Sequence, residues 1–437
     1  MAVAQINLLF GCDMHTFIFN WRFVLLISPV FFLAIKSWTN ALVMITSVLA
    51  MLHLVRRPTP ASPLPAQRVT GSDRWVIAAL GMPLLAVCIG QLLRWEFYPP
   101  NFDAPLRLAL CIPIFMALQT GWLASKDPDE PALTVQWTLT MFPIAMLVTL
   151  PFFHFTSSAF GNQRGTYFVD PLTFASYTLL FSLLSLAALT HFWHDINTPR
   201  RLLGILGIVV GMYMSVTTNS RSGWINLPFF LLLWTFILLK PKWGLVKSLV
   251  PLFGILVLTA LVLWFKPALI DKFALAVHEI QSYQWNEMNP DTSVGMRISF
   301  YRFAYFYFLH SPWAGWGDLG WLKLMNSPEL MVYASEFARD FARNGFHNEI
   351  VTSTIRSGVW GLMASVMLFA VPIIRALRGL SLQFAHARYH SFVILVFMIH
   401  LLVTGMTTEV TNLVFLCSFI GLSLSILLSD QARHMRL

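Results

Sequence analysis

Twelve apolar stretches, each about 17 residues or longer, follow one another along this chain, and they limit its fold more than any other feature. A helix of about 20 apolar residues crosses the hydrocarbon core of a bilayer. Of the 437 residues, 57% are hydrophobic and only 11% are charged, whereas a soluble domain typically carries about 25% charged residues. This composition excludes a disordered chain and speaks against a soluble dinucleotide or nucleic-acid enzyme. It predicts an all-α polytopic membrane protein.

The predicted spans leave one long connection, which divides the chain into three parts. Residues 1–265 carry nine spans, residues 266–346 form a large loop with two short helices, and residues 347–437 carry three spans. The predicted spans are 16–35, 37–55, 75–93, 106–124, 132–153, 171–190, 202–218, 224–239, 248–265, 349–374, 391–408 and 411–429. No repeat relates the two halves, which weakens a transporter built from symmetric halves.

The distribution of lysine and arginine between the connections predicts the orientation. The loops after even-numbered spans and the C-terminus hold Arg56, Arg57, Arg68, Arg74, Lys126, Arg200, Arg201, Lys240, Lys242, Lys247, Arg375, Arg378, Arg388, Arg433 and Arg436. The short loops on the other side hold only Lys36, Arg94, Arg107, Arg164 and Arg221. Cationic loops stay in the cytoplasm. We therefore expect both termini in the cytoplasm and the large loop outside, and we expect no cleavable signal peptide.

The large loop has the composition of a folded element. Residues 296–310 (MRISFYRFAYFYFLH) predict an aromatic helix that lies on or dips into the outer membrane surface and ends at Ser311-Pro312. The glycines after Trp313 predict a turn. A second helix is expected from the N-cap Ser327 to Gly345, with Arg339 and Arg343 as surface charges in its last turns.

Two arginines are candidates for binding an anion on the outer side. Arg221 lies in a polar break, Thr218-Asn219-Ser220-Arg221-Ser222-Gly223, between two spans. It is either a cation that snorkels from a span end or a guanidinium suited to a phosphate. Arg297 begins the aromatic helix and either contacts lipid headgroups or forms a second arm of the same clamp. Arg302, five residues later, belongs to a different face of that helix.

His347 follows the loop and precedes Asn348 and Glu349 at the start of a predicted span. A lone histidine is often structural, but a neutral imidazole beside an amide and a carboxylate also suits a general base. Glu349 and Arg356 form one polar stripe along that span, either as a structural pair or as part of a site. Glu409 is a candidate acid or arginine partner on the same side.

Metal and nucleotide chemistry find no support in the sequence. The four cysteines, Cys12, Cys88, Cys111 and Cys417, have no paired spacing, so we expect neither a disulfide nor a zinc site. His191, His194 and Asp195 are a weak metal candidate on the cytoplasmic side. The motifs of zinc proteases, P-loop enzymes and serine hydrolases are missing from the sequence. We therefore expect no cofactor and no nucleic-acid partner.

The order of these motifs resembles the O-antigen ligase/polymerase superfamily of bacterial envelope glycosyltransferases. The resemblance rests on Asn219–Gly223 after a span, Arg297 in the loop helix, Gly315-Trp316-Gly317, and His347-Asn348 with Gly358 and Gly361 downstream. It covers roughly residues 200–365 and the twelve-span layout. It implies a GT-C-like membrane fold in the bacterial inner membrane, with a periplasmic active site.

The resemblance also implies a reaction and roles for the residues. Members transfer a glycan from an undecaprenyl-pyrophosphate carrier without a metal or a nucleotide sugar. Arg221 and Arg297 would hold the pyrophosphate, and His347 would take the proton from the acceptor hydroxyl, with inversion at the anomeric carbon. Asn348, Glu349, Arg302 and Glu409 are possible supporting residues.

Three activities within the superfamily stay open. An O-antigen ligase, which uses a lipid A–core oligosaccharide as acceptor, fits the single large loop best. Polymerases tend to have two large loops with glycine eleven residues after an arginine, and the corresponding positions here are Leu232, Phe308 and Ala175. Protein O-oligosaccharyltransferases are usually longer. A twelve-span transporter or flippase is the alternative of another class.

Overall fold

A computed structural model describes residues 22–56, 71–123, 131–156, 164–220, 223–265, 268–381 and 385–434 of the protein. The regular structure in these ranges is entirely helical, which confirms the predicted all-α class. Ten helices in the described ranges are long and apolar enough to cross a membrane. The chain is therefore a polytopic membrane protein.

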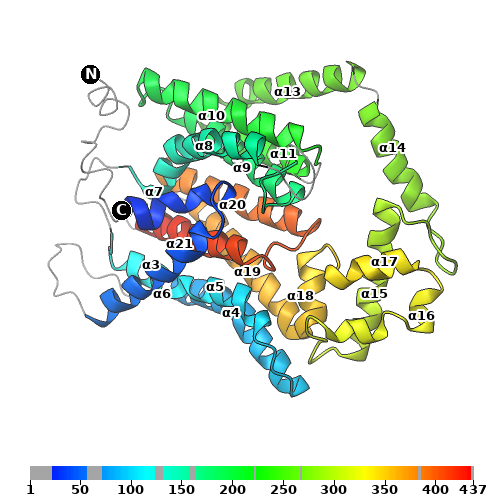
Figure 1. Cartoon of the computed structure of the whole chain (residues 1–437). Helices are drawn as coiled ribbons and strands as arrows, with labels where there is room; N and C mark the ends of the chain where they lie inside the picture. Colours follow the sequence, from blue (N-terminus) through cyan, green and yellow to red (C-terminus); the bar gives the residue numbers. More distant parts are fainter. Residues whose placement is uncertain are drawn as a thin grey trace.

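The helices follow the predicted spans closely (Figure 1). They are η1 (Phe23–Ile27), η2 (Ser28–Leu33), α3 (Trp38–Val55), α4 (Gly71–Arg94), α5 (Pro100–Ala109), α6 (Cys111–Gln119), α7 (Leu133–Gln136), η3 (Trp137–Met141), α8 (Phe142–Phe155), α9 (Pro171–His191), α10 (Thr198–Thr217), η4 (Gly223–Ile225), α11 (Asn226–Leu233), η5 (Trp234–Leu239), α12 (Lys240–Trp243), α13 (Leu245–Phe265), α14 (Ala268–Gln281), α15 (Ser293–His310), η6 (Gly320–Leu324), α16 (Pro328–Met331), α17 (Glu336–Phe341), η7 (Ala342–Asn344), α18 (Glu349–Ser357), α19 (Val359–Leu380), α20 (Ala385–Gly405) and α21 (Val414–His434).

Two predicted spans differ from the structure. The described part of the first is wound as π- and 3-10-helix, in η1 and η2. The ninth, by contrast, corresponds to α13, a helix of 21 residues. The predicted span 349–374 is broken at Gly358, whose φ of +62° ends α18 before α19 begins. The prediction that Glu349 and Arg356 lie on a spanning helix is therefore wrong, because both lie on the short helix that precedes it.

The core of the bundle is built from helices that are apolar on every side. In α9 and α21, 89% of the spanning window is buried, and in α20 83% is buried. A helix that is hydrophobic all round is covered by lipid or by other helices, and here other helices cover it. Aromatic rings from distant segments meet here, with Phe32 stacked on Phe419 at 4.3 Å and Phe142 stacked on Phe181 at 4.0 Å.

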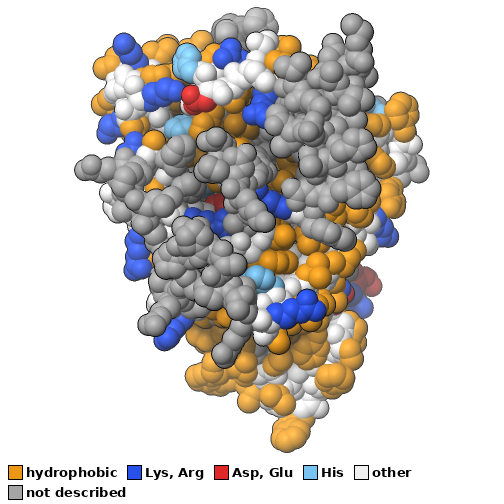
Figure 2. All heavy atoms as spheres, turned by 90° about the vertical axis from the view of Figure 1, so that its left-hand side faces the viewer, with side chains coloured by type: hydrophobic (Ala, Val, Ile, Leu, Met, Phe, Trp, Pro, Cys, Tyr) orange, Lys and Arg blue, Asp and Glu red, His pale blue; other side chains and the backbone are white. Residues whose placement is uncertain are grey.

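The two ends of the bundle carry different groups. At one end, Arg433 donates to the Leu118 carbonyl and Lys242 donates to the His191 carbonyl. At the other end the bundle contacts the large loop. Figure 2 views the molecule from the side opposite to that loop and shows several Lys and Arg side chains on this face. The arrangement agrees with the charge asymmetry of the sequence.

The large loop folds into a unit of its own, residues 293–357, which we call the loop unit; it lies at the right of Figure 1. Its core is separate from that of the bundle and includes Phe300, Phe303, Tyr307, Trp321, Leu330, Phe346 and Ile355. Residues on one face of α15 belong to this core. The aromatic residues of that helix therefore pack inside the loop unit as well as lying on its outer surface. The second predicted helix is instead two short ones, α16 and α17, and it ends at Gly345 as predicted.

Candidate active site

His347 lies in a strained turn of the loop unit, between η7 and α18. Its φ is +49°, a left-handed conformation that is uncommon for a residue with a side chain. The His347 N–H donates to Glu409 Oε1 at 2.7 Å, and the Thr352 hydroxyl donates to the same oxygen at 2.9 Å. A Cβ at Gly345 would lie 2.4 Å from that oxygen, so only glycine fits there. Strain that is held by surrounding contacts is typical of functional sites.

Asn348 fixes the residue after this turn. Its Oδ1 accepts from the Val351 N–H at 3.2 Å and so caps the N-terminus of α18. Its Nδ2 donates to the Tyr301 hydroxyl at 3.3 Å, which links the cap to α15. Asn348 therefore orients the backbone that carries His347.

The imidazole of His347 is half-buried between aromatic rings. It stacks on Phe341 at 5.0 Å between ring centroids and on Phe300 at 6.1 Å. Burial lowers the pKa of His347 below its ordinary value, and the Arg297 guanidinium lowers it further. The carboxylates of Glu409 and Asp170 act in the opposite direction and raise that pKa. The net effect keeps the imidazole neutral near pH 7, the state that a general base needs.

Arg297 and Arg302, the two predicted arginines of α15, have different surroundings in the structure. Arg297 lies on the first turns of α15, where it bonds to the Ser293 carbonyl and hydroxyl at 3.0 and 2.7 Å, and its charge acts on His347. Arg302 instead lies 3.5 Å over the Tyr333 ring and donates to the Tyr283 hydroxyl. The two arginines thus serve different surroundings, as their spacing on the helix predicts.

Arg221 lies outside the described residues. The residues that flank it belong to the same end of the bundle as His347. Gly223 packs so closely on α9 that a Cβ there would lie 2.9 Å from Ser176 Cα. The N-cap of that helix is Asp170, whose charge acts on His347.

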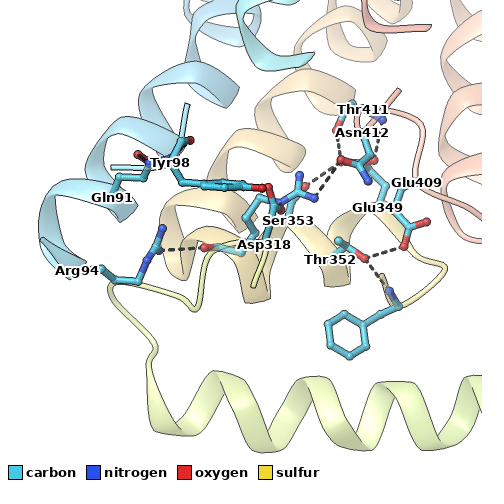
Figure 3. A network of polar contacts seen from close by, with 12 residues as sticks. Gln91, Arg94, Tyr98, Asp318, Glu349, Thr352, Ser353, Glu409, Thr411 and Asn412 are labelled. Carbon is cyan, nitrogen blue, oxygen red and sulfur yellow. Dashed lines mark hydrogen bonds and ion pairs between the residues drawn. The ribbon is translucent and has the colours of Figure 1, made fainter. Parts of the chain in front are cut away.

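Glu349 belongs to a polar network between α18 and the segment before α21 (Figure 3). Arg356 joins the same two segments through Asn412. Glu349 is only 3% exposed, and its carboxylate accepts from the Ser353 hydroxyl and the Thr411 N–H, both at 2.8 Å. Arg356 pairs with Asp318 and donates to Asn412. Glu349 and Arg356 line one cavity of about 30 Å³, which is large enough for a water molecule but not for a sugar.

Arg94 is a residue that the sequence analysis did not single out. It ends α4 and donates to the carbonyls of Ala314 and Arg356 at 2.5 and 3.1 Å. It thus holds both the glycine-containing turn and the last turn of α18, whose C-terminal carbonyls favour a cation. In the sequence, Arg94 stands out only as one of the few cationic residues in the short loops predicted on the outer side.

Arg339 is not the surface charge that was predicted. It is 8% exposed and donates to the Met325 carbonyl at 3.0 Å and to Asn326 Oδ1 at 2.7 Å. It is therefore part of the loop unit's interior. Arg343, by contrast, is on the surface and pairs with Asp340 at 2.8 Å, as predicted.

In the described part of the chain, no group of three His, Cys, Asp or Glu side chains is arranged to hold a metal ion. His191 stacks on Tyr389 at the end of the bundle opposite to His347. Cys88, Cys111 and Cys417 are free thiols. The groups around His347 are instead suited to proton transfer and to binding an anion.

Fold and site together define a polytopic membrane protein with a histidine-bearing site where the helix bundle meets a folded loop. Residues 206–366 match the family model described as O-antigen ligase, and this confirms the resemblance seen in the sequence. The chain carries an O-antigen ligase family domain that runs from α10 into α19 and includes Arg221, Arg297 and His347. The family implies transfer of lipid-linked glycans.

One relative is similar over more residues than this domain contains. An uncharacterized protein of Haemophilus influenzae is 22% identical over 284 residues, which are 64% of this chain and 67% of the relative.

Proposed function

We propose that the protein is an O-antigen ligase of the bacterial inner membrane. It transfers a glycan from undecaprenyl pyrophosphate to a lipid A–core oligosaccharide at the periplasmic face. The observation that carries this proposal is the half-buried imidazole of His347: Glu409 holds the backbone of this residue, and burial and the Arg297 guanidinium lower its pKa. We assign the GT-C-like architecture, the three-part division at residues 265 and 347, and the cytoplasmic termini to the same proposal.

The proposed reaction is a single displacement that needs no metal. An acceptor hydroxyl attacks the anomeric carbon of the donor glycan while the bond from that carbon to the pyrophosphate oxygen breaks. His347 takes the proton of the hydroxyl, and Arg297 and Arg221 neutralise the charge that grows on the departing pyrophosphate. Attack from the side opposite to the leaving group inverts the anomeric centre.

The carboxylates of the site have supporting roles in this scheme. Glu409 holds the backbone of His347 and stabilises the imidazolium that forms when the proton arrives, because its charge raises the pKa of His347. Glu349 acts through the backbone, since it joins α18 to Thr411. Asn348 caps α18, the helix that begins at Glu349 directly after His347 and Asn348. Arg302 stabilises the loop unit.

An assay of transfer tests the proposal. The purified protein is incubated in lipid nanodiscs with a glycan on undecaprenyl pyrophosphate, with and without a lipid A–core acceptor, and the products are separated by mass. Glycan on the core lipid is the expected result. Longer glycans on the carrier would identify a polymerase instead. Glycan on an added protein acceptor would identify an oligosaccharyltransferase. Loss of carrier from one leaflet without a new glycosidic bond would identify a flippase.

A further inference from the structure

Two aromatic rings of α17 form an exposed surface directly beside His347. Phe341 is 39% exposed and stacks on the imidazole, with 5.0 Å between centroids and 16° between planes. Phe337 is 57% exposed and stacks on Phe341 at 6.0 Å and 24°. We call these two rings the α17 platform. The Phe341 ring is thus nearly parallel to both the His347 ring and the Phe337 ring.

The α17 platform packs on the core of the loop unit. Phe300, which is 1% exposed, stacks on Phe341 at 6.3 Å and 15°, and it belongs to the loop unit's core. Phe337 and Phe341 are four residues apart on α17, so they share one face of that helix. Ala338 and Arg339 of the same helix are buried. The helix therefore buries its other side and leaves two phenyl rings partly exposed next to the candidate base.

Exposed phenyl rings suit one kind of ligand at a site of this chemistry. The face of an aromatic ring carries partial negative charge and attracts polarised C–H groups. A pyranose ring presents a patch of such C–H groups on one face and hydroxyls around its edge. A sugar that lies on the platform keeps its hydroxyls free to reach the neighbouring imidazole.

We propose that the α17 platform binds the sugar ring of the acceptor. The inference rests on the proposed function, in which His347 takes a proton from the acceptor hydroxyl. A general base must lie about 2.6–3.2 Å from the oxygen that it deprotonates. The sugar that bears this hydroxyl therefore lies over the rings that adjoin His347. The donor is held elsewhere, by arginines on its pyrophosphate.

Steady-state transfer kinetics with Phe341→Ala, Phe341→Leu and Phe341→Trp test this proposal. Loss of one stacked ring is expected to raise the KM for the acceptor about tenfold in Phe341→Ala. The KM for the donor and the kcat at saturating acceptor should change less than about threefold. Phe341→Trp should keep a low acceptor KM, and Phe341→Leu should resemble Phe341→Ala, because it retains apolar bulk but has no ring face.

Tyr305→Ala is the matched control, since Tyr305 is an exposed ring, 68% accessible, on α15 of the same loop unit. It should leave both KM values unchanged. An unchanged acceptor KM in Phe341→Ala, or a rise in the donor KM instead, would overturn the platform as the acceptor subsite while the proposed function stood.

A binding measurement separates failure of this inference from failure of the proposed function. Saturation-transfer NMR with delipidated core oligosaccharide should show saturation of sugar C–H protons with the wild-type protein and with Tyr305→Ala, but not with Phe341→Ala. The same pattern in a protein that transfers no glycan would reject the proposed function and keep the sugar site. Equal signals from all three proteins would reject the sugar site.

Discussion

Three charged groups act on the His347 imidazole, and they do so in opposite directions. Arg297 favours the neutral ring, whereas Glu409 and Asp170 favour the imidazolium. A general base must be neutral before it accepts a proton and must be stabilised as a cation afterwards. Arg297 favours the first state, and the two carboxylates favour the second. The site thus keeps the free imidazole neutral and still offers counter-charge to the protonated form.

His347→Ala is expected to lower transfer by about 10²- to 10⁴-fold, because the general base is lost. Binding of the lipid-linked donor should remain, since the arginines that hold the pyrophosphate are unchanged. Product formation in the nanodisc assay and donor co-purification measure the two effects. Normal glycan transfer by this variant would remove the general-base role.

The pH dependence of transfer should move in opposite directions in two variants. Activity falls on the acid side as His347 becomes protonated, so this limb follows the pKa of that residue. Glu409→Gln removes a charge that raises the pKa and should shift the limb to lower pH, whereas Arg297→Ala removes a charge that lowers it and should shift the limb to higher pH. Profiles of kcat/KM against pH for both variants check the signs; shifts in the same direction would contradict the assignment.

Lysine is expected to replace Arg221 or Arg297 only in part. An ammonium keeps the charge, but it cannot form two parallel hydrogen bonds to phosphate oxygens. We expect the alanine variants to lose carrier binding and turnover, with the lysine variants between them and the wild type. Donor KM and kcat for the four variants and the wild type decide this, and full activity of both lysine variants would argue against a bidentate clamp.

At the scale of elements, α18 is fixed at both ends by contacts with other parts of the chain. Its N-terminal side is the Glu409-bound turn, and its C-terminal carbonyls accept from the Trp316 and Gly317 N–H groups at 2.8 and 2.9 Å. The Val359 N–H returns a bond to the Pro312 carbonyl. The Gly315-Trp316-Gly317 turn is therefore a lock that holds α18, and with it His347, in place within the loop unit.

Gly315→Ala should destabilise the protein by more than the cost of a left-handed residue alone, which is about 1–2 kcal/mol. Gly315 has a φ of +63°, and a Cβ there would lie 2.5 Å from the Gly358 nitrogen. Gly244→Ala is the control, because Gly244 has a φ of +78° with open space around its Cβ position. Thermal unfolding followed by tryptophan fluorescence measures both. A melting temperature for Gly315→Ala equal to that of Gly244→Ala would contradict the lock.

At the scale of the whole molecule, the loop unit and the cationic end of the bundle lie on opposite sides (Figure 1). We expect the loop unit in the periplasm and the cationic end in the cytoplasm. A variant with its native cysteines replaced can carry Lys323→Cys in the loop unit or Lys242→Cys at the other end. A membrane-impermeant maleimide should label the first in intact spheroplasts and the second only after permeabilisation. Labelling of Lys242→Cys in intact spheroplasts would reverse the proposed orientation.

The sequence alone determined the class of the protein and the approximate course of its helices. Each span depends on the composition of about 20 consecutive residues, so it can be found without knowing the partners of those residues. The same holds for the charge asymmetry between the connections. The motif order identified the family domain, because Arg297, the glycine turn and His347 occur at recognisable places along the chain.

The tertiary structure decided how these residues are held. Glu409 is 62 positions from His347, and Arg94 is 262 positions from the Arg356 carbonyl that it contacts. No local pattern reveals such pairs. The prediction from sequence therefore placed Arg339 on the surface and Arg356 in a membrane span. The lowered pKa of His347 and the partial exposure of Phe341 likewise depend on burial and on distances in space. These arise only when segments far apart in the chain pack together.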